Sequence, residues 1–243
     1  MTPSAPTHTI TQVSIMNALL VSKFDGLLPV KDLLEHGNHG IGTFNQMDGE
    51  MIVIDGVIYQ GKADGKTYQP DPENLTPFGT VCNFVPDITW ELTEPVDYPG
   101  LDESINEMAP NPNVYCAIRV DGQFSRVKTH SLVKQEKPYK PTHEVVKECV
   151  QSEMENVSGT IIGFRGTPQM RGLNDTDYHL HFITDDRTRG GHLLEFEMDR
   201  GSCAVNFCTN HVMMMPGDGA FLKDVDMSKD IVGDFFAALG AEA

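Results

Sequence analysis

The sequence feature that most constrains the fold is a run in which histidine alternates with apolar residues, Tyr178-His179-Leu180-His181-Phe182. In a β-strand, side chains at positions i and i+2 point to the same face, so the run predicts a strand that presents His179 and His181 side by side. His192 follows after a polar turn that ends in Gly190-Gly191. This spacing favours a hairpin whose returning strand begins near His192.

These histidines suggest a metal site. Three imidazoles that meet on one sheet face, with a fourth position open, are the ligand set of a catalytic zinc site. The spacing therefore predicts that His179, His181 and His192 bind Zn²⁺. Short histidine pairs also arise without a metal. The alternative is an exposed strand face, with His192 as a turn residue.

Composition narrows the classes of partner. The chain has 243 residues, enough for one large or two modest domains, and its 40% hydrophobic and 22% charged residues are ordinary for a soluble globular protein. The net charge of −17 argues against nucleic acid or an anionic membrane surface as a partner. An anionic substrate would therefore need a local positive feature, such as a metal or an arginine. No stretch approaches the roughly 20 apolar residues of a membrane span.

Cysteine usage and the N-terminus both favour a cytoplasmic protein. The N-terminal residues lack a basic region followed by an apolar run, so no signal peptide is expected. The cysteines are odd in number, scattered and without a CxxC pair, which predicts reduced thiols rather than a disulfide framework. They are Cys82, Cys116, Cys149, Cys203 and Cys208.

The pattern along the chain predicts an α+β fold, with two mixed or antiparallel β-sheet subdomains, a few flanking helices and the metal site on the second sheet. Helices are expected at 11–23, at 30–37 and at the end of the segment 224–239, and hairpin turns at Asp55-Gly56 and Asp121-Gly122. His36 and His39 are read as polar residues at a helix end. The polar stretch 134–141 predicts a boundary between subdomains 1–140 and 141–243.

Two further features of the sequence, a lone acid and a basic strand face, each have more than one interpretation. Glu50 opens an otherwise apolar strand, either as an edge residue in water or as a deliberately placed carboxylate. Alternation in the strand that ends near Leu132 places Arg126, Lys128 and His130 on one face. A solvated basic edge accounts for Arg126 and Lys128.

Two blocks of the sequence closely resemble the α-acetolactate decarboxylase family. The first is Gly40-Ile41-Gly42-Thr43-Phe44 with Asp48-Gly49-Glu50 and Asp55-Gly56-x-x-Tyr59-Gln60. The second is Gly159-Thr160-Ile161-Ile162-Gly163, the histidine strand and Gly190-Gly191-His192. The resemblance runs from about Leu19 to the C-terminus.

The resemblance implies a set of roles. His179, His181 and His192 would be the zinc ligands, and Thr43 and Glu50 would line the pocket. A glutamate near the C-terminus folds back over the metal in the family, and Glu242 is the only acid after the last predicted helix. The family also implies a homodimer of two-domain subunits.

Three positions depart from the family pattern. His130 stands where the family has an arginine that orients the substrate, Asp177 replaces a glycine, and Arg165-Gly166 replaces an aromatic residue. Histidine donates fewer hydrogen bonds than arginine and is only partly charged near neutrality. Arg165 and Arg171 are candidates to supply the missing charge.

By this resemblance, the expected reaction is zinc-dependent decarboxylation of the keto acid 2-acetolactate to acetoin and CO2. The metal would stabilise an enediolate, and Glu50 or Glu242 would deliver the proton. One alternative is an enzyme on the same scaffold that decarboxylates, rearranges or dehydrates another hydroxy-keto acid. Another is a non-catalytic metal-binding protein, which the pocket acid disfavours. A His-x-His strand could also belong to a cupin barrel, but the block with Gly-Thr-Phe and Asp-Gly-Glu has no role in that fold.

Overall fold

Two β-sheets packed face to face form the core of the computed structural model, which describes residues 6–217 and 220–240. The first sheet has seven strands in the order β15-β1-β8-β3-β4-β5-β6. All neighbours in it are antiparallel except β1 and β15, which run parallel. Its strands are β1 (Thr9–Val13), β3 (His39–Thr43), β4 (Glu50–Ile54), β5 (Val57–Gly61), β6 (Thr67–Tyr68), β8 (Gly79–Cys82) and β15 (Asn210–Met214).

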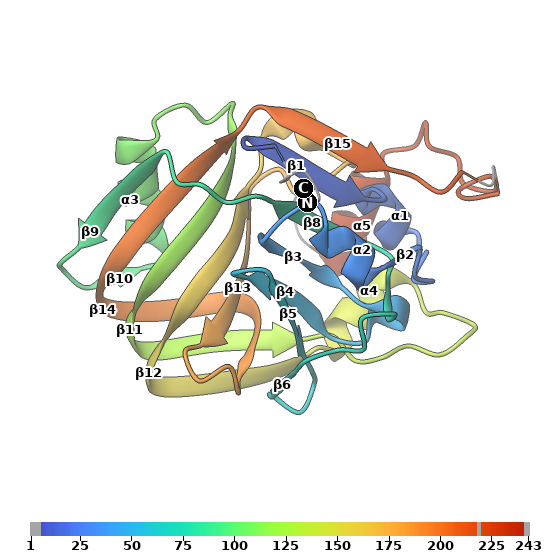
Figure 1. Ribbon diagram of the computed structural model, residues 1–243. Coiled ribbons are helices and arrows are strands. Elements are labelled where there is room, and N and C mark those ends of the chain that lie inside the picture. The colour runs from blue at the N-terminus through green and yellow to red at the C-terminus, as the bar shows by residue number, and fades with distance from the viewer. Residues whose placement is uncertain (1–5, 218–219, 241–243) are drawn as a thin grey trace.

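The second sheet is antiparallel and strongly curved, and its long strands sweep around one side of the molecule (Figure 1). Its order is β10-β14-β11-β12-β13, with β9 also paired to β14. Because β13 pairs in addition with the start of β14, the strands β14, β11, β12 and β13 close into a ring. The strands are β9 (Ile88–Leu92), β10 (Val96–Asp97), β11 (Tyr115–Ser131), β12 (Val150–Arg165), β13 (Tyr178–Thr184) and β14 (Gly190–Cys208).

The apolar side chains that face inward from the two sheets form a shared core. Ile41 and Ile52 from the first sheet pack with Ile162, Phe164 and Ile183 from the second, and all are at most 2% exposed. β-branched and aromatic residues of this kind favour strands because they pack well on a pleated surface. The shared core holds β13 against β4, and this contact brings the two predicted functional blocks together.

Helices cover the ends of the sheets. Figure 1 shows α1, α4 and α5 gathered at one end of the molecule, where they contact one another. The short pair β2 (Leu28–Pro29) and β7 (Leu75–Thr76) lies beside them. The helices are α1 (Met16–Leu20), α2 (Val30–Leu34), α3 (Tyr98–Met108), α4 (Thr142–Val145) and α5 (Ile231–Leu239), with 3₁₀ turns η1 (Asn45–Met47), η2 (Val146–Glu148) and η3 (Pro168–Met170).

The α+β prediction is confirmed, and so is the hairpin at Asp55-Gly56, where both residues have positive φ as a two-residue turn requires. The boundary at 134–141 follows β11 and stays a prediction. The five cysteines are free, and four are buried.

Three local predictions are wrong. The helix expected at 11–23 is confined to α1, because the β-branched residues before it form the buried strand β1. Asp121-Gly122 is not a turn, since β11 runs through it with partners on both sides. A Cβ at Gly122 would lie 2.6 Å from Met198 Sδ, so this glycine serves close packing. His39 is a buried residue of β3, stacked on Phe84, and not a helix cap.

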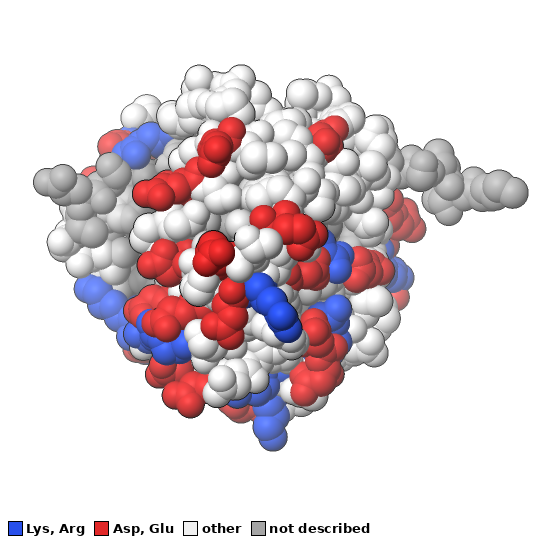
Figure 2. Space-filling view, turned by 90° about the vertical axis from the view of Figure 1, so that its left-hand side faces the viewer, with Lys and Arg blue, Asp and Glu red and all other residues white. Residues whose placement is uncertain are grey.

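Negative charge is spread over the face that carries α3 and β9. Figure 2 shows Asp and Glu side chains scattered across this face, with Lys and Arg interspersed among them. Arg126, for example, lies within ion-pair distance of Glu153, Glu195 and Glu197. This face therefore offers an anionic polymer no continuous basic surface. No helix of the described residues is long and apolar enough to cross a membrane.

Candidate metal centre and active site

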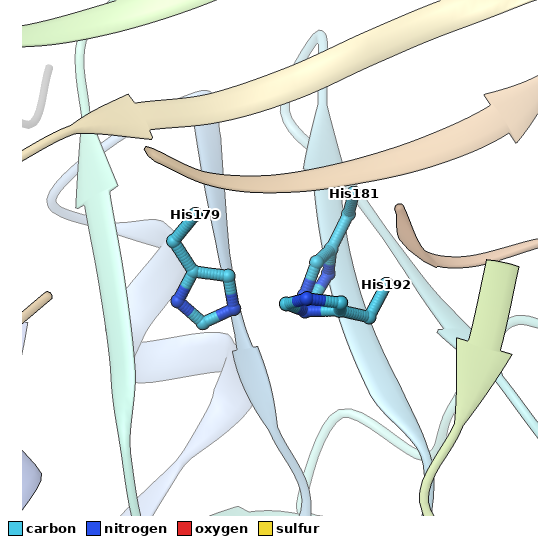
Figure 3. Close-up of side chains that lie close together, drawn as sticks. All are labelled: His179, His181 and His192. Carbon is cyan, nitrogen blue, oxygen red and sulfur yellow. The ribbon is translucent and has the colours of Figure 1, made fainter. Parts of the chain in front are cut away.

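Three imidazoles converge where β13 and the start of β14 lie side by side (Figure 3). His179 and His181 project from one face of β13, as their spacing predicts, and His192 lies directly opposite His181 on β14. One nitrogen from each ring lies within 4.8 Å of the others. The hairpin therefore brings together the three histidines that the sequence singled out.

Hydrogen bonding of His181 leaves one ring nitrogen available as a ligand. Its Nδ1 lies 2.8 Å from the carbonyl oxygen of Met51 on β4. A carbonyl only accepts, so Nδ1 carries the proton and Nε2 carries the lone pair of a neutral ring. His181 is fully buried, and its Nε2 has no hydrogen-bond partner within the described chain. Burial lowers the pKa of His181 well below its usual range, so the lone pair stays free.

His179 is oriented by a carboxylate. Its Nδ1 donates to Asp175 Oδ2 at 2.6 Å, which leaves Nε2 for a ligand. Burial of the ring opposes protonation, but the carboxylates of Asp175 and Glu50 together outweigh burial and raise the pKa of His179. Asp175 is itself anchored, because its N–H donates to Asn174 Oδ1, and Asn174 donates to Gln12 Oε1 and Thr80 Oγ1.

Two glycines allow the strands of the site to approach one another. Gly163 on β12 faces the carbonyl of His179, and a Cβ there would lie 2.0 Å from that oxygen. Its φ of +152° is also one that other residues rarely adopt. A Cβ at Gly191 would lie 2.6 Å from the carbonyl of His130. The glycine directly before His192 therefore serves strand packing as well as the turn.

Glu50 is a buried carboxylate beside the histidines. It is 4% exposed, with Oε2 3.7 Å from His181 Nε2, while Oε1 accepts the Leu132 N–H at 3.1 Å. Burial raises the pKa of Glu50 to about 7. A cation held by the imidazoles would lower the pKa of Glu50, because a nearby positive charge favours the ionised carboxylate. Of the two interpretations from the sequence, the structure excludes an edge residue in water, because the Glu50 carboxylate is buried.

Thr43 and His130 complete the polar side of the site. Thr43 pairs with Glu50 across β3 and β4, and its hydroxyl donates to the Gly49 carbonyl at 2.7 Å. His130 lies opposite His192 on β11, and the two rings stack with centroids 4.5 Å apart. Burial lowers the pKa of His130 to about 4. His130 therefore supplies no fixed positive charge.

A cavity of about 480 Å³ opens over these residues. Thr43, Glu50, His130, His179 and His192 line its polar side, and His181 lies beneath them. The rest of the wall is mostly apolar and comes largely from the helices α1 and α5 and the α4–η2 segment. A concave, largely apolar site with a few convergent polar groups is the usual form of a small-molecule site.

The two arginine candidates lie in different places. Arg165 is 4% exposed and donates to the carbonyls of Ala109 and Asn111, away from the cavity lining. Arg171 lines the cavity, and it is the only Lys or Arg among the described lining residues. Its Nη2 donates to both carboxylate oxygens of Asp230, at 3.0 and 3.2 Å. Arg171 alone can therefore present a positive charge to a ligand here.

The three histidines fit a transition-metal ion. His181 is buried and the other two rings are partly buried, and the pKa values of His181 and His192 are depressed, which keeps their lone pairs free. Zn–N bonds of 2.0–2.1 Å in a tetrahedral site place ligand nitrogens about 3.4 Å apart, so small ring rotations would close the site. The unpartnered Nε2 of His181 is the strongest sign, since a buried polar atom rarely goes unpaired.

The structure adds one residue to the site that the sequence analysis missed, and one predicted residue lies outside the part of the chain that it describes. Asp175 was not among the predicted residues; an acid four residues before a ligand histidine is too common a pattern to identify its role. Glu242 lies outside the described residues.

Known proteins resemble this chain over nearly its whole length. Residues 10–228 match the family model of alpha-acetolactate decarboxylase. The alpha-acetolactate decarboxylase of Methanosarcina mazei is 43% identical over 210 residues, which cover 86% of this chain and 73% of that protein. That of Klebsiella aerogenes is 37% identical over 220 residues, covering 90% and 84%. The crystal structure of alpha-acetolactate decarboxylase from Bacillus subtilis strain 168 superposes with a TM-score of 0.89 at 32% identity, covering 96% of this chain and all of that one.

With a family-model match over most of the chain and close relatives in both sequence and structure, this chain belongs to the alpha-acetolactate decarboxylase family.

Proposed function

We propose that this protein is a zinc-dependent decarboxylase that converts 2-acetolactate to acetoin and CO2. The observation that carries the proposal is the cavity in which three converging imidazoles lie beside a buried carboxylate. A purely structural zinc site is closed by a fourth protein ligand and needs no such cavity. Membership of the family agrees with this reading.

The site needs an electron sink and a proton donor. When bound by His179, His181 and His192, the ion would supply a Lewis acid for the negative charge that develops on substrate oxygens as CO2 leaves. The electrons of the broken C–C bond form an enediolate, which must be protonated on carbon to give the hydroxyketone. We assign delivery of that proton to Glu50, and its position in the cavity lining beside His181 supports this role.

The other residues would hold this arrangement in place. Asp175 keeps the His179 ring oriented, and the Met51 carbonyl does the same for His181. Thr43 fixes the Gly49 carbonyl next to Glu50. The apolar walls exclude water, which strengthens every electrostatic interaction in the cavity. Delivery of the proton from one side predicts a single acetoin enantiomer.

Glu242 is proposed to reach the metal as a further ligand or to act as the proton donor. The last residue of α5, Leu239, lines the cavity, and Glu242 follows three residues later in the sequence. This supports the proposal. Glu242→Gln should then weaken both zinc binding and turnover, while Glu91→Gln, on the distant strand β9, should change neither.

The function is tested with purified protein loaded with zinc and the same protein stripped by a chelator. Acetoin formation from racemic 2-acetolactate is followed on a chiral column. The proposal expects zinc-dependent release of one enantiomer, and loss of both zinc and activity in His179→Ala. Turnover that persists in a zinc-free His179→Ala variant would refute the scheme.

A second candidate is the same chemistry on a different hydroxy-keto acid. The observation that favours it is His130, an uncharged ring stacked on His192 at the position where the family has an arginine. Tight zinc binding without acetolactate turnover would select this candidate.

The homodimer is also a proposal, supported only by the family resemblance. Light scattering of the purified protein tests it, and a mass near the monomer value of 26.9 kDa would refute it.

A further inference from the structure

The cavity has two chemically different sides. Side chains able to bind a metal or a hydroxy-keto acid project from strands β3, β4, β11, β13 and β14 and from the loop 171–176, which carries Arg171. The opposite wall comes largely from helices and is mostly apolar. Its main residues are Leu19, Leu20, Val146, Phe235, Phe236 and Leu239.

Helix α5 is held over the cavity as a fixed part of this wall. Asp230 caps its N-terminus by accepting the Gly233 N–H at 3.0 Å, and the same carboxylate pairs with Arg171. Near its other end, Lys147 Nζ donates to the Ala238 carbonyl at 3.3 Å. The helix therefore has tethers at both ends, and it contacts α1 and α4 along its length.

The aromatic residues of α5 are turned toward the cavity. Phe235 and Phe236 are both half-buried and line it, with their ring centroids 5.4 Å apart. Such a wall would be left in contact with water if the ligand reached only the histidines. Covering it with a ligand removes apolar surface from water, which is worth a factor of about four in affinity for each buried methylene.

The cavity is larger than acetolactate requires. That molecule has about nine non-hydrogen atoms, and at no more than the roughly 30 Å³ that one water occupies in the liquid it fills at most about 270 Å³. About 200 Å³ of the 480 Å³ cavity then remains. On the same scale this space holds about seven further carbon atoms.

We propose that the wall formed by α1, α4–η2 and α5 is a subsite for an apolar substituent of about four to seven carbons on a 2-hydroxy-3-oxo acid. The preferred substrates are then larger than acetolactate and carry an alkyl or benzyl group in place of one of its methyl groups. This inference rests on the proposed function of the same cavity. Either methyl-bearing carbon, C2 or the acyl end, can carry the larger group, and the test separates the two.

The test compares zinc-loaded wild-type protein on a series of 2-hydroxy-3-oxo acids. One arm varies the C2 substituent from methyl to butyl to benzyl, and the other varies the acyl end in the same way. CO2 release gives kcat/KM for each compound. We expect kcat/KM to rise at least tenfold from methyl to butyl in one of the two arms.

A binding measurement accompanies the kinetics. Calorimetry with unreactive 2-alkyl-2-hydroxy acids, which lack the oxo group, measures affinity without turnover. We expect the dissociation constant to fall about two- to fourfold for each methylene, with a negative heat-capacity change.

Two variants locate the effect. Phe235→Ala and Leu239→Ala should each reduce the butyl-to-methyl ratio of kcat/KM by about fivefold or more. Met227→Ala removes an exposed apolar side chain outside the cavity lining and should keep the wild-type ratio.

The outcomes distinguish this inference from the proposed function. If acetolactate is decarboxylated but kcat/KM rises along neither arm, and affinity for the 2-alkyl-2-hydroxy acids does not rise with chain length, the subsite is refuted and the function stands. If no compound is decarboxylated but affinity still rises with chain length and falls in Phe235→Ala, the subsite stands and the decarboxylase proposal fails. The subsite would also be refuted if Met227→Ala reduced the butyl-to-methyl ratio of kcat/KM as strongly as Phe235→Ala does.

Discussion

The carboxylate behind His179 offers the sharpest test of the metal site. Asp175→Asn keeps the shape of the side chain and an oxygen that accepts the proton of His179 Nδ1, but removes the negative charge 2.6 Å from that nitrogen. A negative partner makes an imidazole a better electron donor to a metal. The variant therefore isolates the electrostatic part of the contact.

The expected size follows from the geometry. Loss of an outer-shell partner of a ligand histidine typically weakens metal binding by about 10- to 100-fold. The Asp175 side chain is 36% exposed, so solvent screens part of the interaction, and asparagine keeps the hydrogen bond. We therefore expect the lower end, a tenfold increase in the zinc dissociation constant, or about 1.4 kcal/mol.

Competition between the protein and a chromogenic chelator, at about pH 8 where an unperturbed histidine is neutral, measures this constant. Asp177→Asn is the matched control, because Asp177 lies on the same loop and its carboxylate accepts the N–H of Tyr178 rather than the proton of a ring in the histidine cluster. Circular dichroism checks that both variants are folded. Equal zinc affinity in Asp175→Asn and the wild type would refute the reasoning, and equal weakening in both variants would assign the effect to net charge alone.

Three further predictions concern the metal, the cavity charge and acid stability. Removing zinc with a chelator should lower the Tm by about 8–16 °C. The reason is that free zinc at 1,000 times its Kd adds about 4 kcal/mol to the free energy of unfolding, and each kcal/mol is worth about 2–4 °C in a chain of this size. An unchanged Tm in calorimetry would contradict the prediction. Arg171→Gln should raise KM for an anionic substrate about two- to fivefold, which is the effect of losing one solvent-exposed ion pair with the substrate. Asp230→Asn breaks the ion pair between Asp230 and Arg171 but keeps the cation, so it should not raise KM. Burial lowers the pKa of His39 to about 4, so its contribution to stability is complete above about pH 6.5 and is lost as the pH falls toward 4. His39→Leu should therefore reduce the acid-dependent loss in that window, by at most about 3 kcal/mol in urea titrations, and a loss as large as in the wild type would contradict this prediction.

Periodicity predicted the strands and the faces of their side chains, and it failed where a residue's partners are distant. The alternation in 178–182 placed His179 and His181 on one face because the period of a strand is two. Val13 fitted a helical pattern equally well, but pairing with β8 and β15 made it part of a strand. Asp121-Gly122 looked like a turn because local sequence does not show that two neighbouring strands bond to it.

The amino-acid sequence by itself determined the chemistry available to this protein. It contains a His-x-His strand, a returning histidine after two glycines and an acid at the mouth of an apolar strand. These local patterns predicted the three histidines as metal ligands and singled out Glu50 without deciding its role. Their physical basis is short-range: strand alternation and turn geometry act over a few residues.

Only the tertiary structure decided how that chemistry is arranged. Packing of β4 against β13 set Met51 on His181 and Glu50 beside it, although they are about 130 residues apart in the sequence. The same packing placed Arg171 in the cavity and Arg165 outside it, and laid the apolar face of α5 over the histidines. Such contacts depend on the burial of whole sheets and helices against each other, which no local pattern records.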